Sequence, residues 1–189
     1  MDKAYLDEGV RERLIFSGIA EFEEHGFLDF SLRRVATKAQ VSCAAPYRHF
    51  KDKEELILAV IRYVRDCWGL LCKEICEVFS SSPSRQIVEL CVSGVRFWLA
   101  NGSFRSVLMG GTFDKNEDIK AEMRLFDKPI LNAIDNYCSN MKLEEERCTQ
   151  LTYSVNALFW GTVMLTASAR ADESEKLIAE MKERLIAEL

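Results

Sequence analysis

The segment from Leu151 to Ala169 constrains the fold most, because its apolar side chains surround almost the whole circumference of a helix. Bulky residues such as Phe159 and Trp160 alternate there with small ones such as Gly161, and charged residues are absent. A helix that is apolar on every side must be covered on every side. A two-layer helical domain can bury one face. The other face therefore predicts a second subunit, the alternative being the central helix of a monomer.

The rest of the chain also favours helices. Nine glycines and three prolines are few interruptions for 189 residues. No apolar run reaches the roughly 18 residues that a membrane-spanning helix needs. The first residues, Met1 to Tyr5, lack a basic stretch followed by an apolar core, so we expect no secretory signal and a cytoplasmic protein. We therefore predict an all-α fold of about nine helices.

The cysteines do not indicate a disulfide framework. They number seven, an odd count, and lie scattered through helical segments. With two histidines in the chain, ligands for zinc are few, and we expect neither a metal nor another cofactor. Reduced thiols packed as small apolar groups are the simplest interpretation. A redox trigger that uses Cys43, or Cys72 and Cys76 one helical turn apart, is the alternative.

Charge is distributed unevenly along the chain. The net charge is −5, yet the stretch from Ser31 to Lys53 holds six basic residues and one acid, which leaves −10 on the remainder. A short basic block on an acidic body indicates where a polyanionic partner would bind. A basic but merely solvated face is the alternative.

The basic block lies among short helices near the N-terminus. Arg11–His25 has its apolar residues at helical spacing, with Phe22 among them and Glu21 on another face. Gly26 follows as a C-terminal stop, where glycine adopts the left-handed conformation most easily. This pattern predicts an amphipathic first helix that ends at residue 25.

Three more helices follow at once. Ser31–Gln40 forms the second, with the serine as its N-cap, and Cys43–Phe50 forms the third, with Ser42 as its cap and Pro46 at the end of its first turn. The fourth, Asp52–Phe79, begins with the D-x-x-E pattern of a capping box. Two short helices braced by longer ones are typical of a helix-turn-helix.

The remaining sequence shows no repeat. Gly110-Gly111-Thr112 is a break rather than a phosphate-binding loop, since the Lys-Ser/Thr of that motif is missing. Pro129 is expected to kink or interrupt its helix. Further helices are predicted over Arg85–Asn101, Phe104–Met109, Glu117–Cys138, Glu145–Ala169 and Glu173–Glu188.

The region from Arg11 to Val60 resembles the tetracycline-repressor-like (TetR) family of transcriptional regulators. The likeness rests on Phe22-x-x-x-Gly26-Phe27, on Ser31-Leu32-Arg33-Arg34-Val35-Ala36, and on the run from Val41 to Leu56 with its Tyr-x-His-Phe-Lys-x-Lys core. At Gln40 the sequence departs from the glycine that is usual in the family. The resemblance implies a helix-turn-helix head over residues 1–52 and a helical regulatory and dimerisation domain over 53–189, linked by the helix 53–79.

The resemblance also implies contacts with duplex DNA. We expect Arg33 to contact a base, because a guanidinium can pair with both acceptors of guanine. Tyr47, His49 and Lys53 are expected to contact phosphates, although each has a purely structural alternative. The predicted DNA-binding residues are Arg33, Arg34, Ser42, Cys43, Ala44, Ala45, Tyr47, Arg48, His49 and Lys53.

A ligand pocket and a dimer interface are implied in the second domain. Most aromatic residues at helical spacing are ordinary core, but together they suggest an apolar or aromatic ligand. The pocket candidates are Trp68, Phe97, Trp98, Phe104, Met109, Phe113, Phe126, Tyr153, Asn156, Phe159 and Trp160. The interface candidates are Leu158, Gly161, Thr162, Leu165, Ser168, Leu177, Met181 and Leu185.

These implications favour a homodimeric regulator that binds a palindromic operator and is released by a small molecule. A helical-bundle enzyme is the alternative of another class. The two histidines, His25 and His49, both lie in the expected helix-turn-helix head, and neither has the spacing of a ligand pair. No other catalytic constellation is visible, so we predict that the chain is not an enzyme.

Overall fold

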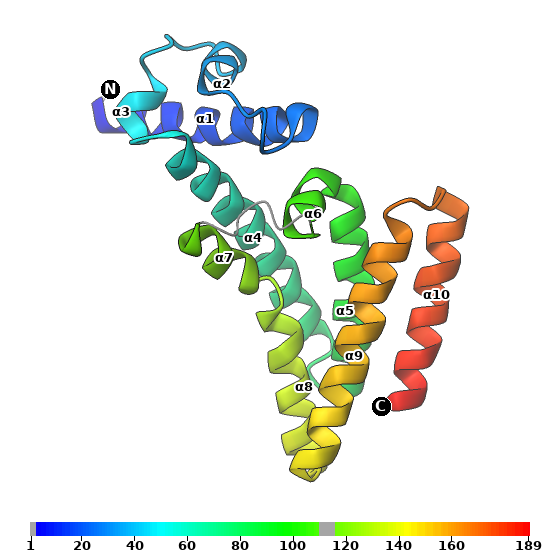
Figure 1. Cartoon of the computed structure of the whole chain (residues 1–189). Helices are drawn as coiled ribbons and strands as arrows, with labels where there is room; N and C mark the ends of the chain where they lie inside the picture. Colours follow the sequence, from blue (N-terminus) through cyan, green and yellow to red (C-terminus); the bar gives the residue numbers. More distant parts are fainter. Residues whose placement is uncertain (1–2, 110–115) are drawn as a thin grey trace. The chain divides into compact units, whose positions relative to one another are not determined.

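The computed structural model describes residues 3–109 and 116–189, and the side chains within 9–105 and 116–189. Over these residues it contains α-helices and no strand, which confirms the all-α prediction (Figure 1). The helices are α1 (Lys3–His25), α2 (Leu32–Lys38), α3 (Pro46–His49), α4 (Lys53–Val78), α5 (Pro83–Ala100), α6 (Gly102–Met109), α7 (Glu117–Arg124), α8 (Lys128–Met141), α9 (Glu145–Thr166) and α10 (Ala171–Glu188).

The chain divides into two compact units. The first comprises Met1–Cys67 and Ser103–Leu125, and the second comprises Trp68–Gly102 and Phe126–Leu189. α4 therefore starts in the first unit and ends in the second, while α6 and α7 belong almost wholly to the first. The predicted boundary at residue 52, between a DNA-binding domain and a regulatory domain, stays a prediction.

In the first unit, α1 packs against α2 and α3, and its fully buried side chains include Leu14 and Phe22. Gly18 lets α4 approach closely, since a Cβ there would lie 2.8 Å from Cγ2 of Val60. The ring of Phe104 from α6 stacks on Phe22, with centroids 4.6 Å apart. α6 is therefore part of the core that supports α1.

Two left-handed residues end helices in this unit. Gly26 has a φ of 68°, as its position after α1 predicts. Gln40 has a φ of 55°, and its N–H donates to Thr37 O while Val41 N–H donates to Ala36 O. This pair of bonds is a Schellman motif at the end of α2. The position that usually carries glycine in the family thus needs a positive φ here as well.

The start of α3 differs from the prediction. Cys43, Ala44 and Ala45 form a turn closed by a 2.9 Å bond from Ala45 N–H to the carbonyl oxygen of Ser42, and the helix begins only at Pro46. Ser42 therefore closes a turn and does not cap α3. Pro46 occupies the first turn of the helix, where its missing N–H has no intrahelical partner to lose.

The start of α4 follows the predicted capping box with one change. Asp52 Oδ1 accepts from the N–H of Glu55 at 2.9 Å, while the Glu55 carboxylate accepts from the N–H of Lys51 at 2.5 Å. In the standard capping box the Glu55 carboxylate would accept from the N–H of the N-cap residue, Asp52. Here it accepts from the N–H of Lys51, one residue earlier.

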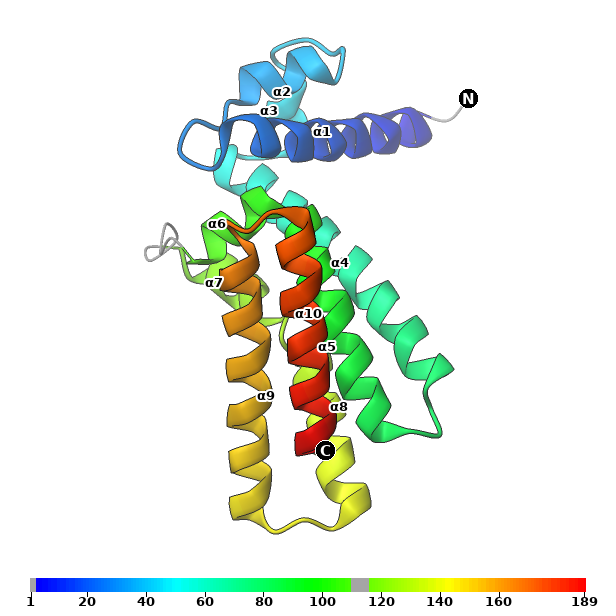
Figure 2. The ribbon, with the colours of Figure 1, turned by 90° about the vertical axis from the view of Figure 1, so that its right-hand side faces the viewer.

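The second unit is a helical bundle around α5, which contacts α8, α9 and α10. α9 and α10 lie side by side (Figure 2). Gly94 of α5 allows a tight crossing, because a Cβ there would lie 2.8 Å from a ring carbon of Phe159.

The helix predicted over Glu117–Cys138 is interrupted. α7 ends at Arg124 and α8 begins at Lys128, with Pro129 in the first turn of α8. Among the helices of the described residues, none has both the length and the apolarity that crossing a bilayer requires.

Candidate nucleic-acid interface

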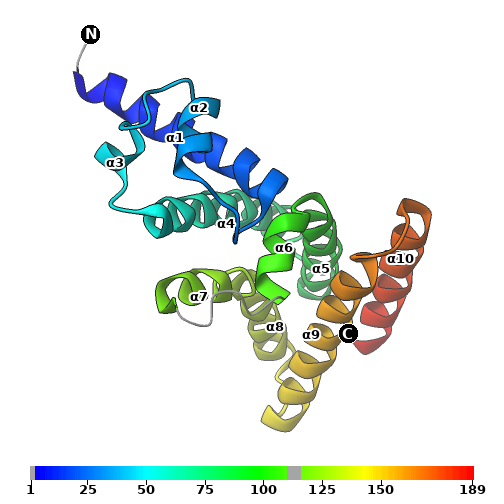
Figure 3. The same cartoon turned by 45° about the horizontal axis from the view of Figure 1, so that its top comes forward.

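α2 and α3 form the two short helices of a helix-turn-helix, and both pack on α1 (Figure 3). Ser31 caps α2, its Oγ accepting from Arg34 N–H as predicted. The guanidinium of Arg11 on α1 lies 5.3 Å from the ring centroid of the buried Phe50, which follows α3 directly. The N-terminal unit thus fixes both ends of the motif to a longer helix.

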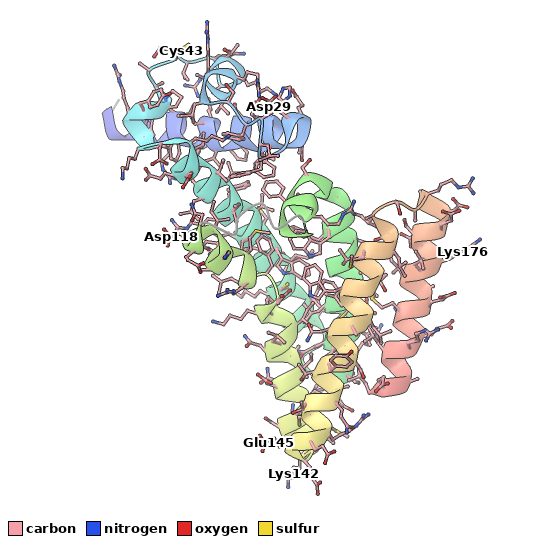
Figure 4. The ribbon with its side chains drawn as sticks, viewed as in Figure 1. Asp29, Cys43, Asp118, Lys142, Glu145 and Lys176 are labelled. Carbon is pink, nitrogen blue, oxygen red and sulfur yellow. The ribbon has the colours of Figure 1, made fainter. Side chains whose placement is uncertain are left out.

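Most of the predicted DNA-binding residues are exposed on this motif. Tyr47 on α3 is 63% exposed although it is aromatic, and Arg33 and Arg48 are exposed as well. Cys43, labelled in Figure 4, lies in the exposed turn before α3 together with Ser42 and Ala44, while Ala45 and His49 are half-buried. Among the described residues, no hydrogen bond or ion pair engages the side chains of Arg33, Tyr47 or Arg48. These groups are available to a partner.

Lys53 is held at the start of α4. Its ammonium group donates to the carbonyl oxygen of Leu28 at 3.4 Å and lies 5.4 Å and 6.0 Å from the ring centroids of Phe27 and Phe30. These contacts fix the cation on the loop after α1 and at the N-terminus of α4, where the helix dipole favours an anion.

Arg34 and Lys38 behave differently from the other basic residues. Arg34 Nε donates to Glu21 Oε1 at 2.6 Å, and Lys38 Nζ lies 3.4 Å from the other oxygen of the same carboxylate. Glu21 is fully buried, although the sequence places it outside the apolar face of the first helix. The spacing of Arg34 and Lys38, four residues apart on α2, is the signal that points to a shared acidic partner.

The predicted pocket residues separate into several groups. Six rings of the second unit lie together, with neighbouring centroids 5.0–6.2 Å apart, and Trp68 Nε1 donates to Phe126 O at 3.0 Å. The six are Trp68, Phe97, Trp98, Phe126, Phe159 and Trp160.

Five candidates lie outside this aromatic cluster. Phe104 packs in the first unit, and Tyr153 is 76% exposed on α9. Asn156 donates to the carbonyl oxygen of Thr152, so its partner is its own helix. Phe113 and the side chain of Met109 lie outside the described residues.

The predicted interface residues also differ in exposure. Leu165 and Ser168 are exposed, and Leu158, Gly161 and Leu177 are half-buried. Thr162, Met181 and Leu185 are buried inside their own chain, because one side of α9 and the apolar stripe of α10 face the core of the second unit. These three side chains are therefore not available to a second subunit.

Part of the surface of α9 is apolar and exposed. Its large exposed apolar side chains are Tyr153, Met164 and Leu165, each at least 59% exposed. Two hollows of about 520 and 380 Å³ adjoin it, and both are lined by Tyr153, Ser154 and Glu188. The apolar side of α9 that does not face the core of the second unit is thus left exposed by its own chain.

The cysteines are free thiols. Burial raises the pKa of Cys72 and of Cys91 to about 12 each and that of Cys138 to about 11, which keeps these groups protonated and unreactive. Cys43 and Cys67 are exposed. Among the described residues there is no group of three histidine, cysteine or acidic side chains that could hold a metal ion.

Comparison with known proteins agrees with this geometry. Residues 14–60 match the sequence model of the family described as "Bacterial regulatory proteins, tetR family". An uncharacterized HTH-type transcriptional regulator of Bacillus subtilis, YerO, is 29% identical over 79 residues, which are 42% of this chain and 27% of YerO. The chain thus aligns with about a quarter of that relative's length.

Two solved structures have the same fold. A TetR-family transcriptional regulator of Mesorhizobium loti superposes with a TM-score of 0.73 at 16% identity, covering 96% of each chain. The structure of RolR in complex with the ligand resorcinol gives a TM-score of 0.59 at 20% identity, covering 96% of this chain and 90% of RolR. The helix-turn-helix and the match over residues 14–60 show that the N-terminal part of this chain is a DNA-binding domain of the TetR family, and the whole chain shares the fold of TetR-family regulators.

Proposed function

We propose that this TetR-family regulator acts in the cytoplasm as a homodimer, binds a palindromic operator through α2 and α3, and represses transcription until a small apolar ligand releases it. The observation that carries the proposal is the exposed surface of the head formed by Arg33, Tyr47, Arg48 and Lys51, with the turn at Ser42–Ala44 between its two helices. Cations on such a surface bind phosphates, and the short turn side chains leave room for base edges.

The proposal assigns different roles to residues of this surface. Arg33 reads a base, while Tyr47 and Lys53 contact phosphates. Arg33→Ala should relax the preference at particular base pairs. Lys53→Ala should weaken binding to every sequence and lower the slope of log K against log salt by about one. Tyr47→Phe should also weaken binding to every sequence.

Operator binding can be measured without knowing the regulated genes. The wild-type protein is used to select duplexes from a random library, and its affinity for a selected and a scrambled duplex is then measured by fluorescence anisotropy. Lys176→Ala, an exposed cation of α10, serves as the control and should change neither affinity nor salt slope. Recovery of no preferred duplex would contradict the proposal, as would an equal loss at all base positions for Arg33→Ala.

The proposed dimer uses the exposed apolar surface of α9 together with α10. Burial of Tyr153, Met164 and Leu165 against a symmetry mate would cover the side of α9 that its own chain leaves open. Leu165→Asp should therefore convert the dimer to a monomer in light scattering, whereas Lys176→Asp, on the polar side of α10, should not. A wild-type protein that is monomeric at micromolar concentration would contradict this part of the proposal.

The proposed effector binds at the aromatic cluster of the second unit. The cluster contains all three tryptophans of the chain, Trp68, Trp98 and Trp160, so intrinsic fluorescence reports on it directly. The likeness to RolR, whose ligand is resorcinol, supports testing phenols and other small aromatic compounds first. A compound that changes tryptophan fluorescence should also release the selected duplex. Fluorescence changes without any effect on DNA binding would contradict the regulatory role.

The release mechanism depends on α4, one continuous helix whose first residues belong to the head and whose last residues belong to the second unit. A ligand changes DNA affinity only if it binds the two states of the protein unequally. A redox trigger is the competing mechanism, with the exposed Cys43 as its thiol. Loss of operator binding after peroxide treatment in the wild type but not in Cys43→Ser would favour that mechanism.

A further inference from the structure

The carboxylate of Glu21 on α1 is completely buried, which is unusual for a charged group. A buried charge is tolerated when hydrogen bonds and opposite charges surround it. Glu21 Oε1 accepts from Arg34 Nε at 2.6 Å and from the backbone N–H of Ser31 at 3.2 Å, and Oε2 lies 3.4 Å from Lys38 Nζ. His25 Nε2 is 3.9 Å from Oε2.

These partners are distributed along the whole of α2. Ser31 is the N-cap, Arg34 lies in the first turn and Lys38 is the last residue of the helix. One carboxylate on α1 therefore contacts both ends of α2. Contacts at two ends fix both the position of α2 along α1 and its rotation about its own axis. The rotation determines where the neighbouring Arg33, which is exposed, presents its guanidinium group.

Acidic groups outnumber the cations of this cluster. Arg34 Nη2 also bonds the carbonyl oxygen and, at 3.2 Å, the carboxylate of Asp29, and Lys38 Nζ lies 2.5 Å from Glu24. Glu21, Glu24 and Asp29 thus face two cations. Hydrogen bonding to Glu21 raises the pKa of Arg34, and hydrogen bonding to Glu24 raises the pKa of Lys38, so both cations stay charged in this arrangement.

The six basic residues of the N-terminal block therefore fall into two classes. Arg34 and Lys38 are neutralised by acids of α1 and of the loop after it. Arg33, Arg48, Lys51 and Lys53 remain for the DNA-facing surface. A cation whose charge is already balanced attracts a phosphate only weakly, because binding would have to break the existing ion pair.

We propose that Glu21, Arg34 and Lys38 form a buried ion cluster that positions α2 for DNA recognition, and that Arg34 is a positioning residue rather than a DNA contact. This inference rests on the proposed DNA-binding function, and it revises the DNA-contacting role expected for Arg34. It also assigns a function to Glu21, which no sequence pattern marked.

The test is a double-mutant cycle in DNA binding. Glu21→Leu, Arg34→Leu and the double variant are compared with the wild type on the selected and the scrambled duplex, at salt concentrations between about 50 and 200 mM. Each single variant leaves a buried or half-buried charge without its partner, and should lower affinity for the selected duplex by at least about tenfold more than for the scrambled one. The double variant should recover to within about threefold of the wild type, with an unchanged salt slope.

Circular dichroism at the assay temperature shows whether each variant is folded. If Glu21→Leu does not fold, Glu21→Gln replaces it, since the amide keeps an acceptor for Arg34. Arg33→Leu is the matched control, and the proposal requires that no substitution at position 21 rescues it.

The outcomes separate the inference from the function on which it rests. A double variant that binds no better than Arg34→Leu, with a salt slope lower by about one, would make Arg34 a phosphate contact and overturn the inference. Single variants that keep the affinity and selectivity of the wild type would also overturn it. A wild-type protein that binds no duplex would instead overturn the proposed DNA-binding function.

Discussion

Gln40 offers a quantitative test of the turn that separates α2 from α3. Its φ of 55° lies in the left-handed region, which costs a residue with a Cβ about 1–2 kcal/mol. Glycine has no such cost but loses about 0.5–1 kcal/mol more backbone entropy than alanine on folding. The Schellman hydrogen bonds use backbone groups that glycine retains. Gln40→Gly should therefore stabilise the protein by about 0.5–1 kcal/mol.

The matched control is Gln40→Ala, which removes the exposed side chain but keeps the Cβ and its conformational cost. This variant should have the stability of the wild type. At this chain length a stabilisation of about 0.5–1 kcal/mol raises the melting temperature by about 1–4 °C. Thermal and urea denaturation followed by circular dichroism measure both variants. A glycine variant no more stable than the alanine variant would refute the reasoning.

Three further predictions concern other parts of the molecule. Gly69→Ala in α4, where a Cβ meets no atom within 4 Å, should stabilise the protein by about 1 kcal/mol, whereas Gly94→Ala, 2.8 Å from Phe159, should destabilise it by about 1–3 kcal/mol in urea denaturation. Burial raises the pKa of Asp127 from 3.8 to about 6, so the protonated carboxyl stabilises the fold below pH 3.8 and this contribution is lost as the pH rises through 6. Asp127→Asn should therefore match the wild type near pH 4 and exceed its stability by about 1–3 kcal/mol at pH 8. Equal stability of the two proteins at pH 8 would disprove this. Glu122→Gln, which removes the negative charge paired with Arg62 and Arg65, should destabilise the first unit by about 1–3 kcal/mol, with faster hydrogen exchange in α7 as the measurement.

Local signals in the sequence predicted the local features well. The positive φ after α1 follows from Gly26, and the start of α4 follows from the acids at positions 52 and 55. The interruption near Pro129 was expected for the same reason, since proline belongs in the first turn of a helix. Each of these features depends on residues within one or two helical turns.

Features that depend on tertiary contacts were less predictable. The sequence places Glu21 outside the apolar face of the first helix, and only the approach of α2 explains its burial, because Arg34 and Lys38 compensate the charge. Met181 is predicted in the dimer interface, but it is buried in the core of its own unit. Phe104 was placed with the aromatic cluster, and it packs instead on Phe22, a residue 82 positions earlier in the sequence. Helical periodicity identifies a buried face but does not identify what covers it.

The central claim is that the α2–α3 surface binds duplex DNA, and cross-linking from single cysteines tests it most directly. Cys43 and Cys67 are both exposed, and Cys67 lies about 20 Å from Lys53 along α4. A short photoactivatable maleimide is attached to a variant that keeps Cys43 but carries Cys67→Ser, Cys76→Ser and Cys148→Ser, and to the reciprocal variant that keeps Cys67 and carries Cys43→Ser instead. We predict that illumination joins the selected duplex to position 43 and not to position 67. Cross-links from position 67 with none from position 43 would contradict the account.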